Sequence, residues 1–370
     1  MKVRAEVRVA ALERSFDTYK LNSFSSFYLI HNFCLIDFSL PYYESDFMKA
    51  LSLFSGGLDS ILAVKIIGEQ GVNIFGVFLE TPFFSSQKAV KSAEYIELPL
   101  RVIDVTDSFL NILLNPKHGY GKGLNPCIDC HAFMFKKVGN MMKEEGADFI
   151  ISGEVLGQRP MSQNLRSMTT VSHESNFKDL ILRPLCAKRL PETFPETQGW
   201  VNREKLLGLS GRSRKPQIEL AKKLDIYEYP APAGGCLLTD KIFSGRLKDL
   251  ISTSSTLEKR DLELLKWGRH FRIGEKTRII VGRDQRENEM IYSQKKVRDT
   301  ILTIKDYPGP TVLATGDLSS DELDLAASMA VSYSDAPSNC SVQVRIKWDD
   351  KQWTVSARGR GRKEFAMFMI

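Results

Sequence analysis

Long apolar runs are missing from this 370-residue sequence, and cysteine is scarce. No stretch of 18 consecutive apolar residues occurs, which argues against a membrane-spanning helix. Six cysteines are too few for the disulfide framework of a small secreted protein. No internal repeat or low-complexity tract is visible. With 43% hydrophobic and 26% charged residues, the composition is that of an ordinary globular protein, long enough for two or three domains.

The net charge is only mildly positive, at +6 with a pI near 8.8. This balance permits a polyanionic partner without requiring one. One stretch is more basic than the rest, because seven Lys or Arg residues accompany two acidic residues between Trp200 and Lys223. We expect this stretch to form a basic surface.

Residues 1–47 differ from the remainder, being rich in Phe, Tyr and Ser and lacking helical or strand periodicity. Their run "FYLIHNFCLI" is a poor signal peptide because His31 and Asn32 interrupt it. Met48 directly precedes an expected strand. We therefore expect translation to start at Met48, with residues 1–47 a poorly ordered extension that is not translated. A genuine flexible arm is the alternative, which the intact mass of the native protein would distinguish.

From Met48 onward, apolar strand-like segments alternate with helix-like ones, which predicts an α/β fold with a doubly wound parallel sheet. We expect strands at 50–54, 73–80, 100–105 and 147–153, and helices at 61–70, 86–96 and 133–146. Residues 181–230 read as largely helical. From Leu257 the character changes to a smaller α+β domain, with late strands "SVQVRIKW" and "QWTVSA".

The stretch "SLFSGGLDSILAV" places a Gly-rich turn between the first strand and the first helix. Two glycines let the backbone approach a ligand, and the helix start directs N–H groups and positive charge at it. No Gly-Lys-Ser/Thr follows, so this is not a Walker A loop. The pattern predicts a phosphate cradle with hydroxyl donors and a carboxylate for Mg²⁺, formed by Ser55, Gly56, Gly57, Asp59 and Ser60. A glycine turn with an Asp or Ser cap is the structural alternative.

These residues carry a resemblance. After a strand, SGGLDS resembles the PP-loop of ATP pyrophosphatases, and "SGEVLGQRPMSQNLRSM" (152–168) is similar to the second nucleotide-site segment of tRNA 4-thiouridine synthases. "ILRPL" and the segment 210–240 continue the similarity in the same order, from about Lys49 to Asp240. The resemblance implies an ATP site completed by Gly153 and Gln158, at which ATP and Mg²⁺ adenylate a tRNA uridine before sulfur displaces AMP.

Sulfur transfer needs a carrier, and "NPCIDCHAF" supplies two candidate cysteines, Cys127 and Cys130, before an amphipathic helix. We expect the helix dipole to lower a thiol pKa here. A third candidate, Cys236, lies in the Gly-rich "AGGCLL" far downstream. Some thiouridylases resembling this chain use two cysteines as a persulfide pair. In others a CxxC and one distant Cys hold a [4Fe–4S] cluster with one open iron, and the spacing here fits that pattern better.

Other interpretations of the cysteines stay open. A CxxC with a third Cys and His131 also matches a structural zinc site of Cys₃His type. Persulfide chemistry without a cluster is a further alternative. Cys34, Cys186 and Cys340 have no partner pattern, and we interpret them as small hydrophobic residues. His131 is expected to pack against the helix or cap it rather than to bind a metal.

The C-terminal part carries a second resemblance. "VGRDQRENE" (281–289) and the Pro308–Pro310 segment are similar to the RNA-binding domain of NFACT-type proteins. The tail "RIKWDDKQWTVSARGRGRK" mixes basic residues with Trp348 and Trp353. Basic residues bind phosphates and aromatic rings stack on unpaired bases. For the arginines we favour RNA contacts, whereas for the tryptophans a place in a small core is the better interpretation.

Together these observations predict an ATP-dependent, cytoplasmic tRNA sulfurtransferase that releases AMP and pyrophosphate. Residues 48–250 would form the PP-loop domain and residues 257–370 an NFACT-like RNA-binding domain. The expected partners are tRNA, a sulfide or persulfide donor and a second copy of the chain, with no membrane. Two alternatives remain: a PP-loop enzyme that adenylates a small molecule, and a non-catalytic RNA-binding protein.

Overall fold

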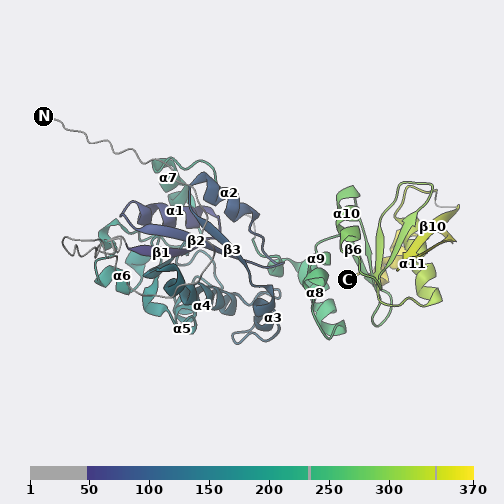
Figure 1. Ribbon diagram of the computed structural model, residues 1–370, viewed down its shortest axis with the longest axis horizontal. Helices are drawn as coiled ribbons and strands as arrows, with labels where there is room; N and C mark the ends of the chain where they lie inside the picture. The colour runs from purple at the N-terminus through teal and green to yellow at the C-terminus, as the bar shows by residue number, and fades with distance from the viewer. Residues whose placement is uncertain (1–47, 232–234, 338–339) are drawn as a thin grey trace, which may run out of the picture. The chain divides into compact units, whose positions relative to one another are not determined.

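The structure is a computed structural model that describes residues 48–231, 235–337 and 340–370. The expectation for residues 1–47 falls outside these ranges. The described residues form two sheets, one built from β1 to β5 and the other from β6 to β11, and each sheet has its own helices (Figure 1). Within these ranges, no helix is both long and apolar enough to cross a membrane.

The first sheet is parallel and five-stranded, in the order β3-β2-β1-β4-β5, which confirms the predicted α/β fold. Its strands are β1 (Lys49–Leu53), β2 (Asn73–Glu80), β3 (Leu100–Asp104), β4 (Phe149–Ser152) and β5 (Ile181–Leu182). The order reverses between β1 and β4, which pair with Leu53 opposite Ser152. Ligands of such sheets bind beyond the carboxyl ends of the strands at this reversal.

Helices cover both faces of this sheet (Figure 1). One apolar core joins the sheet to α1 (Leu58–Gly68), α2 (Gln87–Tyr95) and α7 (Lys215–Lys223). A second core on the other face joins it to α4 (Cys127–Glu145) and α5 (Leu165–Glu174). Because helices cover both faces, consecutive residues of β1 and β4 are buried rather than every second one.

The expectation that residues 181–230 are largely helical is wrong. This region holds β5, the short α6 (Phe194–Thr197), α7 and two single 3₁₀ turns, Ala187–Arg189 and Arg203–Lys205. The prolines at 184, 191 and 195 supply no amide hydrogen to a helix interior, which keeps the segments short. The fifth strand has only two residues, too few for its pattern to be recognised from sequence.

The second sheet is antiparallel and six-stranded, in the order β11-β10-β8-β9-β7-β6. Its strands are β6 (Arg269–Arg272), β7 (Arg278–Val281), β8 (Thr300–Ile304), β9 (Val312–Thr315), β10 (Ser341–Trp348) and β11 (Lys351–Arg358). Helix α11 (Ser320–Ser332) packs on one face, and α10 (Gln285–Ser293) covers β7, β8 and β9 on the other. Helices α8 (Lys241–Thr253) and α9 (Lys259–Leu264) precede this sheet in the chain.

Candidate functional site

The turn between β1 and α1 needs both of its glycines. Gly56 has φ +72°, a left-handed conformation that other residues rarely adopt, and a Cβ there would lie 2.5 Å from Ala89 Cα. Gly57 is the N-cap of α1 and has no side chain to close the helix start. The Ser60 amide donates to the Gly57 carbonyl over 3.0 Å, whereas the structure gives the Leu58 and Asp59 amides no acceptor among the described residues. Those two amides are therefore available to a ligand, as an anion cradle requires.

Two serines order this turn from either side. Ser60 is 2% exposed and donates its hydroxyl to the Gly57 carbonyl over 2.8 Å. The Ser55 hydroxyl donates to Ser60 Oγ over 3.3 Å and accepts from the Gly57 amide over 3.4 Å. Ser55 is exposed, so its hydroxyl can reach a bound molecule, while Ser60 holds the turn from inside.

Asp59 is held by a chain of two glutamine amides. Gln158 Nε2 donates to Asp59 Oδ2 over 2.7 Å, and Gln217 Nε2 donates to Gln158 Oε1 over 2.9 Å. The other carboxylate oxygen, Asp59 Oδ1, is buried and has no hydrogen-bond partner among the residues that the structure describes. An unpaired, buried carboxylate oxygen fits a magnesium ligand, since Mg²⁺ prefers oxygen ligands of this kind.

Gly153 brings the end of β4 against the start of α1. A Cβ at this position would lie 2.5 Å from the Asp59 carbonyl carbon and from the Ser60 nitrogen. No larger residue fits without moving the helix. The structure therefore brings Gly153 and Gln158 together with all five residues predicted from the SGGLDS turn.

The three candidate cysteines gather at the start of α4. Cys127 is the first residue of that helix and Cys130 lies within its first turn. The chain after Cys236 is tied to the same region, because the Leu124 amide donates to the Leu238 carbonyl over 3.2 Å. Cys130 and Cys236 both border one apolar cluster around Phe83 and Phe109.

The expected lowering of a thiol pKa does not hold for Cys130. Burial raises its pKa well above the usual range, and the nearby Cys236, Cys127 and Asp129 raise it further. Burial likewise raises the pKa of Cys236 to about 11; Cys127 adds to this and Arg159 opposes it. For Cys130, which lies in the first turn of α4 and is half-buried, desolvation outweighs the helix dipole.

The His131 side chain contacts a carboxylate rather than the cysteines. Its Nδ1 lies 2.7 Å from Glu154 Oε1, so its partner is a carboxylate beyond β4 rather than the helix that it was expected to pack against or cap. Within the described ranges, no group of three or more His, Cys, Asp or Glu side chains converges on a position for a single metal ion. A Cys₃His zinc site has no support in this geometry.

Several residues that the structure places at the site were not predicted from the sequence. Asn125 Nδ2 donates to Cys127 Sγ over 3.1 Å. Glu154 accepts from Arg183 Nε over 2.7 Å, and both side chains are buried. Burial alone would raise the pKa of Glu154, but Arg183 and His131 outweigh it and hold that pKa at about 2. Glu154 and Arg183 stand inside the motif strings "SGEVLGQ" and "ILRPL", and Gln217 stands inside the segment 210–240 that continues the same similarity.

The remaining cysteines differ from one another. Cys186 is fully buried, donates its thiol to the Glu154 carbonyl over 3.3 Å, and has a pKa raised to about 11 by burial. This confirms it as a small core residue. Cys340 is exposed, and Cys34 lies outside the described ranges.

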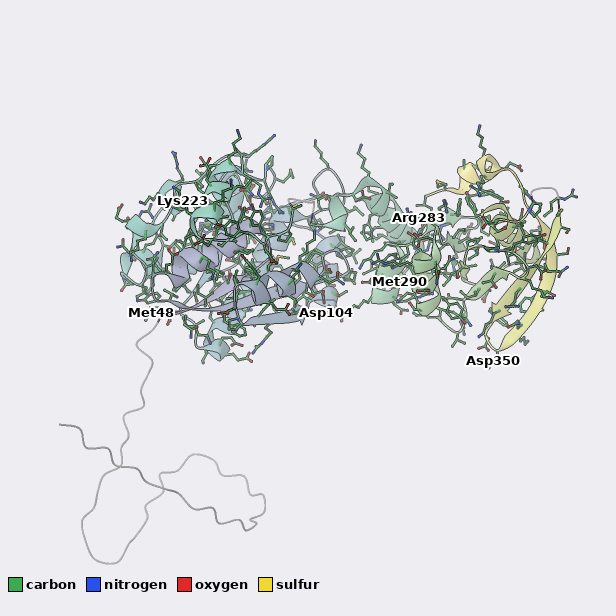
Figure 2. All side chains as sticks on the ribbon, turned by 90° about the horizontal axis from the view of Figure 1, so that it is seen from above. Met48, Asp104, Lys223, Arg283, Met290 and Asp350 are labelled. Carbon is green, nitrogen blue, oxygen red and sulfur yellow. The ribbon has the colours of Figure 1, made fainter. Side chains whose placement is uncertain are left out.

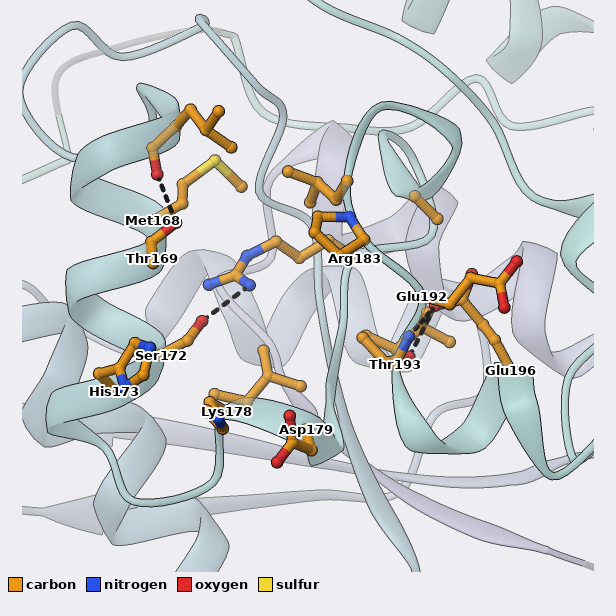
Figure 3. Close-up of a pocket in the computed structure, with 16 residues that line it drawn as sticks. Met168, Thr169, Ser172, His173, Lys178, Asp179, Arg183, Glu192, Thr193 and Glu196 are labelled. Atoms are coloured by element: carbon orange, nitrogen blue, oxygen red, sulfur yellow. Dashed lines mark hydrogen bonds between the residues drawn. The ribbon is translucent and has the colours of Figure 1, made fainter.

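A cavity of about 160 Å³ lies beside α5 and the segment after β5 (Figure 3). Its wall includes Met168, Glu192 and Arg183, whose Nη1 donates to Ser172 Oγ over 3.1 Å. None of the site residues predicted from the sequence lines it.

Comparison with known families confirms both resemblances. Residues 47–189 match the family described as Thiamine biosynthesis protein (ThiI), and residues 268–365 match the NFACT protein RNA binding domain. Neither match spans half of the chain.

Individual relatives agree over the first part of the chain. Over 118 residues it is 30% identical to the tRNA-specific 2-thiouridylase MnmA of Campylobacter curvus, covering 29% of this chain and 34% of that protein. Over 147 residues it is 30% identical to the "Probable tRNA sulfurtransferase" of Lysinibacillus sphaericus, covering 37% and 34%. The chain thus spans about a third of the length of these relatives.

Among solved structures, a crystal structure described as a 4-thiouridine synthetase–RNA complex with bound ATP is 24% identical, with a TM-score of 0.37. The match covers 59% of this chain and 52% of that one.

Proposed function

We propose that this chain is an ATP-dependent tRNA sulfurtransferase that adenylates a uridine carbonyl oxygen and replaces it with sulfur. One observation carries the proposal: the consecutive residues Gln158 and Arg159 interact with the PP-loop and with a candidate cysteine, respectively. Gln158 is hydrogen-bonded to Asp59 in the PP-loop, and Arg159 is close enough to Cys236 to favour its thiolate. The phosphate cradle and the cysteines therefore flank one turn of the chain, as a reaction that passes from ATP to sulfur needs.

The first half-reaction would use the PP-loop. The uridine oxygen attacks the α-phosphorus of ATP, the bond from that phosphorus to the oxygen bridging to the β-phosphorus breaks, and pyrophosphate leaves with its electrons. The Gly56–Gly57 turn and the start of α1 would hold the phosphates by backbone N–H groups. Asp59 Oδ1 would contribute to binding Mg²⁺, which neutralises charge on the departing pyrophosphate.

The second half-reaction would use the cysteines. A sulfur nucleophile adds to the activated uridine carbon, and the carbon–oxygen bond breaks so that AMP leaves with the oxygen. The residues Cys127, Cys130 and Cys236 fit a [4Fe–4S] cluster, since cluster ligands bind different irons and need not converge on one point. When bound, a cluster with three thiolate ligands would present one open iron to sulfide.

Burial raises the pKa values of Cys130 and Cys236, so both thiols stay protonated at neutral pH until a partner takes up their protons. A bound metal would do this, because it deprotonates its thiol ligands outright. Asn125 would then donate a hydrogen bond to the Cys127 sulfur, a contact of the kind that tunes clusters.

The proposed division of labour assigns residues 48–250 to the ATP pyrophosphatase and residues 257–370 to RNA binding. The partners would be tRNA and a sulfide or persulfide donor. Because the chain covers a third of its relatives, these assignments rest on the site itself and on the matched segments.

The deciding experiment is a mass-spectrometric census of tRNA nucleosides from cells lacking the gene and from complemented cells. Loss and return of one thiolated nucleoside is expected. An unchanged census would instead favour a small-molecule substrate, which ATP–pyrophosphate exchange that is insensitive to tRNA would confirm. Failure of the purified protein to bind ATP would favour a non-catalytic RNA-binding role.

A further inference from the structure

The two faces of the antiparallel sheet differ in chemistry where β8, β10 and β11 lie side by side. On one face Val342, Val344 and Ile346 of β10 are buried in the core that α11 covers. Across the strand pair, Val355 and Ala357 of β11 lie opposite Val344 and Val342 on this face. Successive side chains of a strand point to opposite faces, so the intervening residues form a second surface.

That second surface, the β8–β10–β11 face, is polar and open. It comprises Thr303 of β8 and Lys305 just after it, Gln343, Arg345 and Lys347 of β10, and Gln352, Thr354 and Ser356 of β11. Arg345 lies between Thr303 and Thr354 in the strand register. Six of these eight residues are exposed, and Thr303 and Lys347 are half-buried. Figure 2 shows the β10–β11 hairpin, with Asp350 at its tip, at the margin of its sheet.

The charges on this face are of one sign. The strands β8, β10 and β11 contain no Asp or Glu. Among the described residues, no ion pair involves Lys305, Arg345 or Lys347. In the same part of the chain, Arg260, Arg272 and Arg283 each pair with a carboxylate.

Aromatic rings are kept off this face. Trp353 lies opposite Ile346 in the register and so belongs to the face on the α11 side. Trp348 is two residues after Ile346 in β10 and so lies on the same face as Ile346. Lys351 Nζ lies 5.7 Å from the centroid of the Trp348 ring. A surface with cations and hydroxyls can bind phosphates and 2′-hydroxyls, and without aromatic rings it offers little for stacking on unpaired bases.

We propose that the β8–β10–β11 face binds the sugar–phosphate backbone of a base-paired arm of tRNA. Lys305, Arg345 and Lys347 contact phosphates, and the Thr, Ser and Gln side chains beside them contact sugars. Paired RNA hides its bases and displays phosphates and 2′-hydroxyls, which are the groups this surface can recognise. The inference rests on the proposed function, since it assumes that tRNA is the substrate.

The test measures tRNA affinity at several salt concentrations by fluorescence anisotropy. The variant Lys305→Gln/Arg345→Gln/Lys347→Gln is compared with wild type and with Lys276→Gln, a change of exposed charge in the turn between β6 and β7. Each lost phosphate contact lowers the slope of log affinity against log salt by about 0.7–0.9. We expect the triple variant to lose about 2–3 in slope and about tenfold or more in affinity at low salt. Lys276→Gln should match wild type.

The outcomes separate this inference from the proposed function. Wild-type protein that fails to bind tRNA would contradict the proposed function itself. If wild type binds and the triple variant binds equally with the same slope, the face is not the RNA surface. A wild-type preference for polyuridylate over an RNA hairpin would also overturn the inference, because it would require base stacking. Unchanged circular dichroism and melting temperature of the triple variant exclude a folding defect.

Discussion

Gln158 Nε2 donates to Asp59 Oδ2 over 2.7 Å, which joins the first turn of α1 to a loop residue 99 positions further along the chain. The partner of Asp59 is a neutral amide, so the carboxylate is positioned without being neutralised by a cation. A glutamine amide offers a donor at one end and an acceptor at the other, and Gln217 binds the acceptor end. Gln217 therefore decides that Gln158 presents its donor to Asp59.

The variant Gln217→Met tests this positioning. Without the second hydrogen bond, Gln158 can turn its carbonyl toward Asp59 and repel it. A hydrogen bond of this kind contributes about 0.5–1.5 kcal/mol, so we expect the Mg²⁺ concentration for half-maximal ATP binding to rise about three- to tenfold. Isothermal calorimetry at several Mg²⁺ concentrations measures this directly, without depending on turnover.

Glu219→Gln is the matched control for this variant, because Glu219 is an exposed residue on the same helix α7. It should leave the Mg²⁺ dependence unchanged. If Gln217→Met also leaves it unchanged while Asp59→Asn abolishes it, the amide chain has no part in metal binding.

Gly153→Ala should damage the phosphate cradle through the backbone. Its methyl group would lie 2.5 Å from backbone atoms of Asp59 and Ser60, so the start of α1 must move. We expect a loss of about 1–3 kcal/mol in the free energy of unfolding and a loss of the thermal shift that ATP produces. Urea denaturation and thermal melts with and without ATP measure both.

Gly245→Ala is the counterpart of that change. Gly245 lies inside α8, and a Cβ there has no atom within 4 Å. The substitution should stabilise the protein by up to about 1 kcal/mol and leave ATP binding intact. Equal effects of both alanines would show that Gly153 is not packed against α1.

If Cys127, Cys130 and Cys236 hold a cluster, replacing any of them should remove iron, whereas replacing Cys186 should not. In protein purified without oxygen, Cys127→Ala, Cys130→Ala and Cys236→Ala should each lose most of the iron and labile sulfide. Cys186→Ala should keep both, because Cys186 is a buried residue bonded to the Glu154 backbone. Chemical iron and sulfide analysis measures this. A colourless, zinc-loaded wild type that still thiolates tRNA would rule the cluster out.

Glu154 should contribute a defined part of the acid stability. Its pKa is about 2 in the folded protein against an ordinary value of 4.5. Because the folded pKa is lower, the stabilisation is fully present above about pH 4.5 and is lost as the pH falls toward 2. We expect the difference in unfolding free energy between wild type and Glu154→Gln to shrink over this range, as measured by urea denaturation.

At neutral pH the same variant should be strongly destabilised, by about 3–5 kcal/mol, because Arg183 is buried and would lose its charged partner. The double variant Glu154→Gln/Arg183→Met should recover part of this loss. A double variant no more stable than Glu154→Gln would contradict the importance of the ion pair.

Local pattern predicted the parallel sheet well. Strands β2 and β3 and helices α1 and α2 fall close to their expected ranges, since each is long enough to show its period. Helix α4 ends as expected before Gly146 but begins at Cys127 rather than at Phe133, so the CxxC lies within the helix and not before it. The same approach failed across residues 181–230, where proline-broken segments and a two-residue strand take their conformation from the rest of the molecule.

Three features could be recognised from the sequence: the SGGLDS turn, the CxxC near a helix, and the late strands of the second sheet. These features depend on residues next to one another, so local stereochemistry decides them. The folded structure was needed to show that Cys236 lies near the CxxC, that burial raises its pKa, and that Gln217 orients the partner of Asp59. Those relationships join residues far apart in the chain, and they exist only once the closure of the fold brings them together and excludes water from around them.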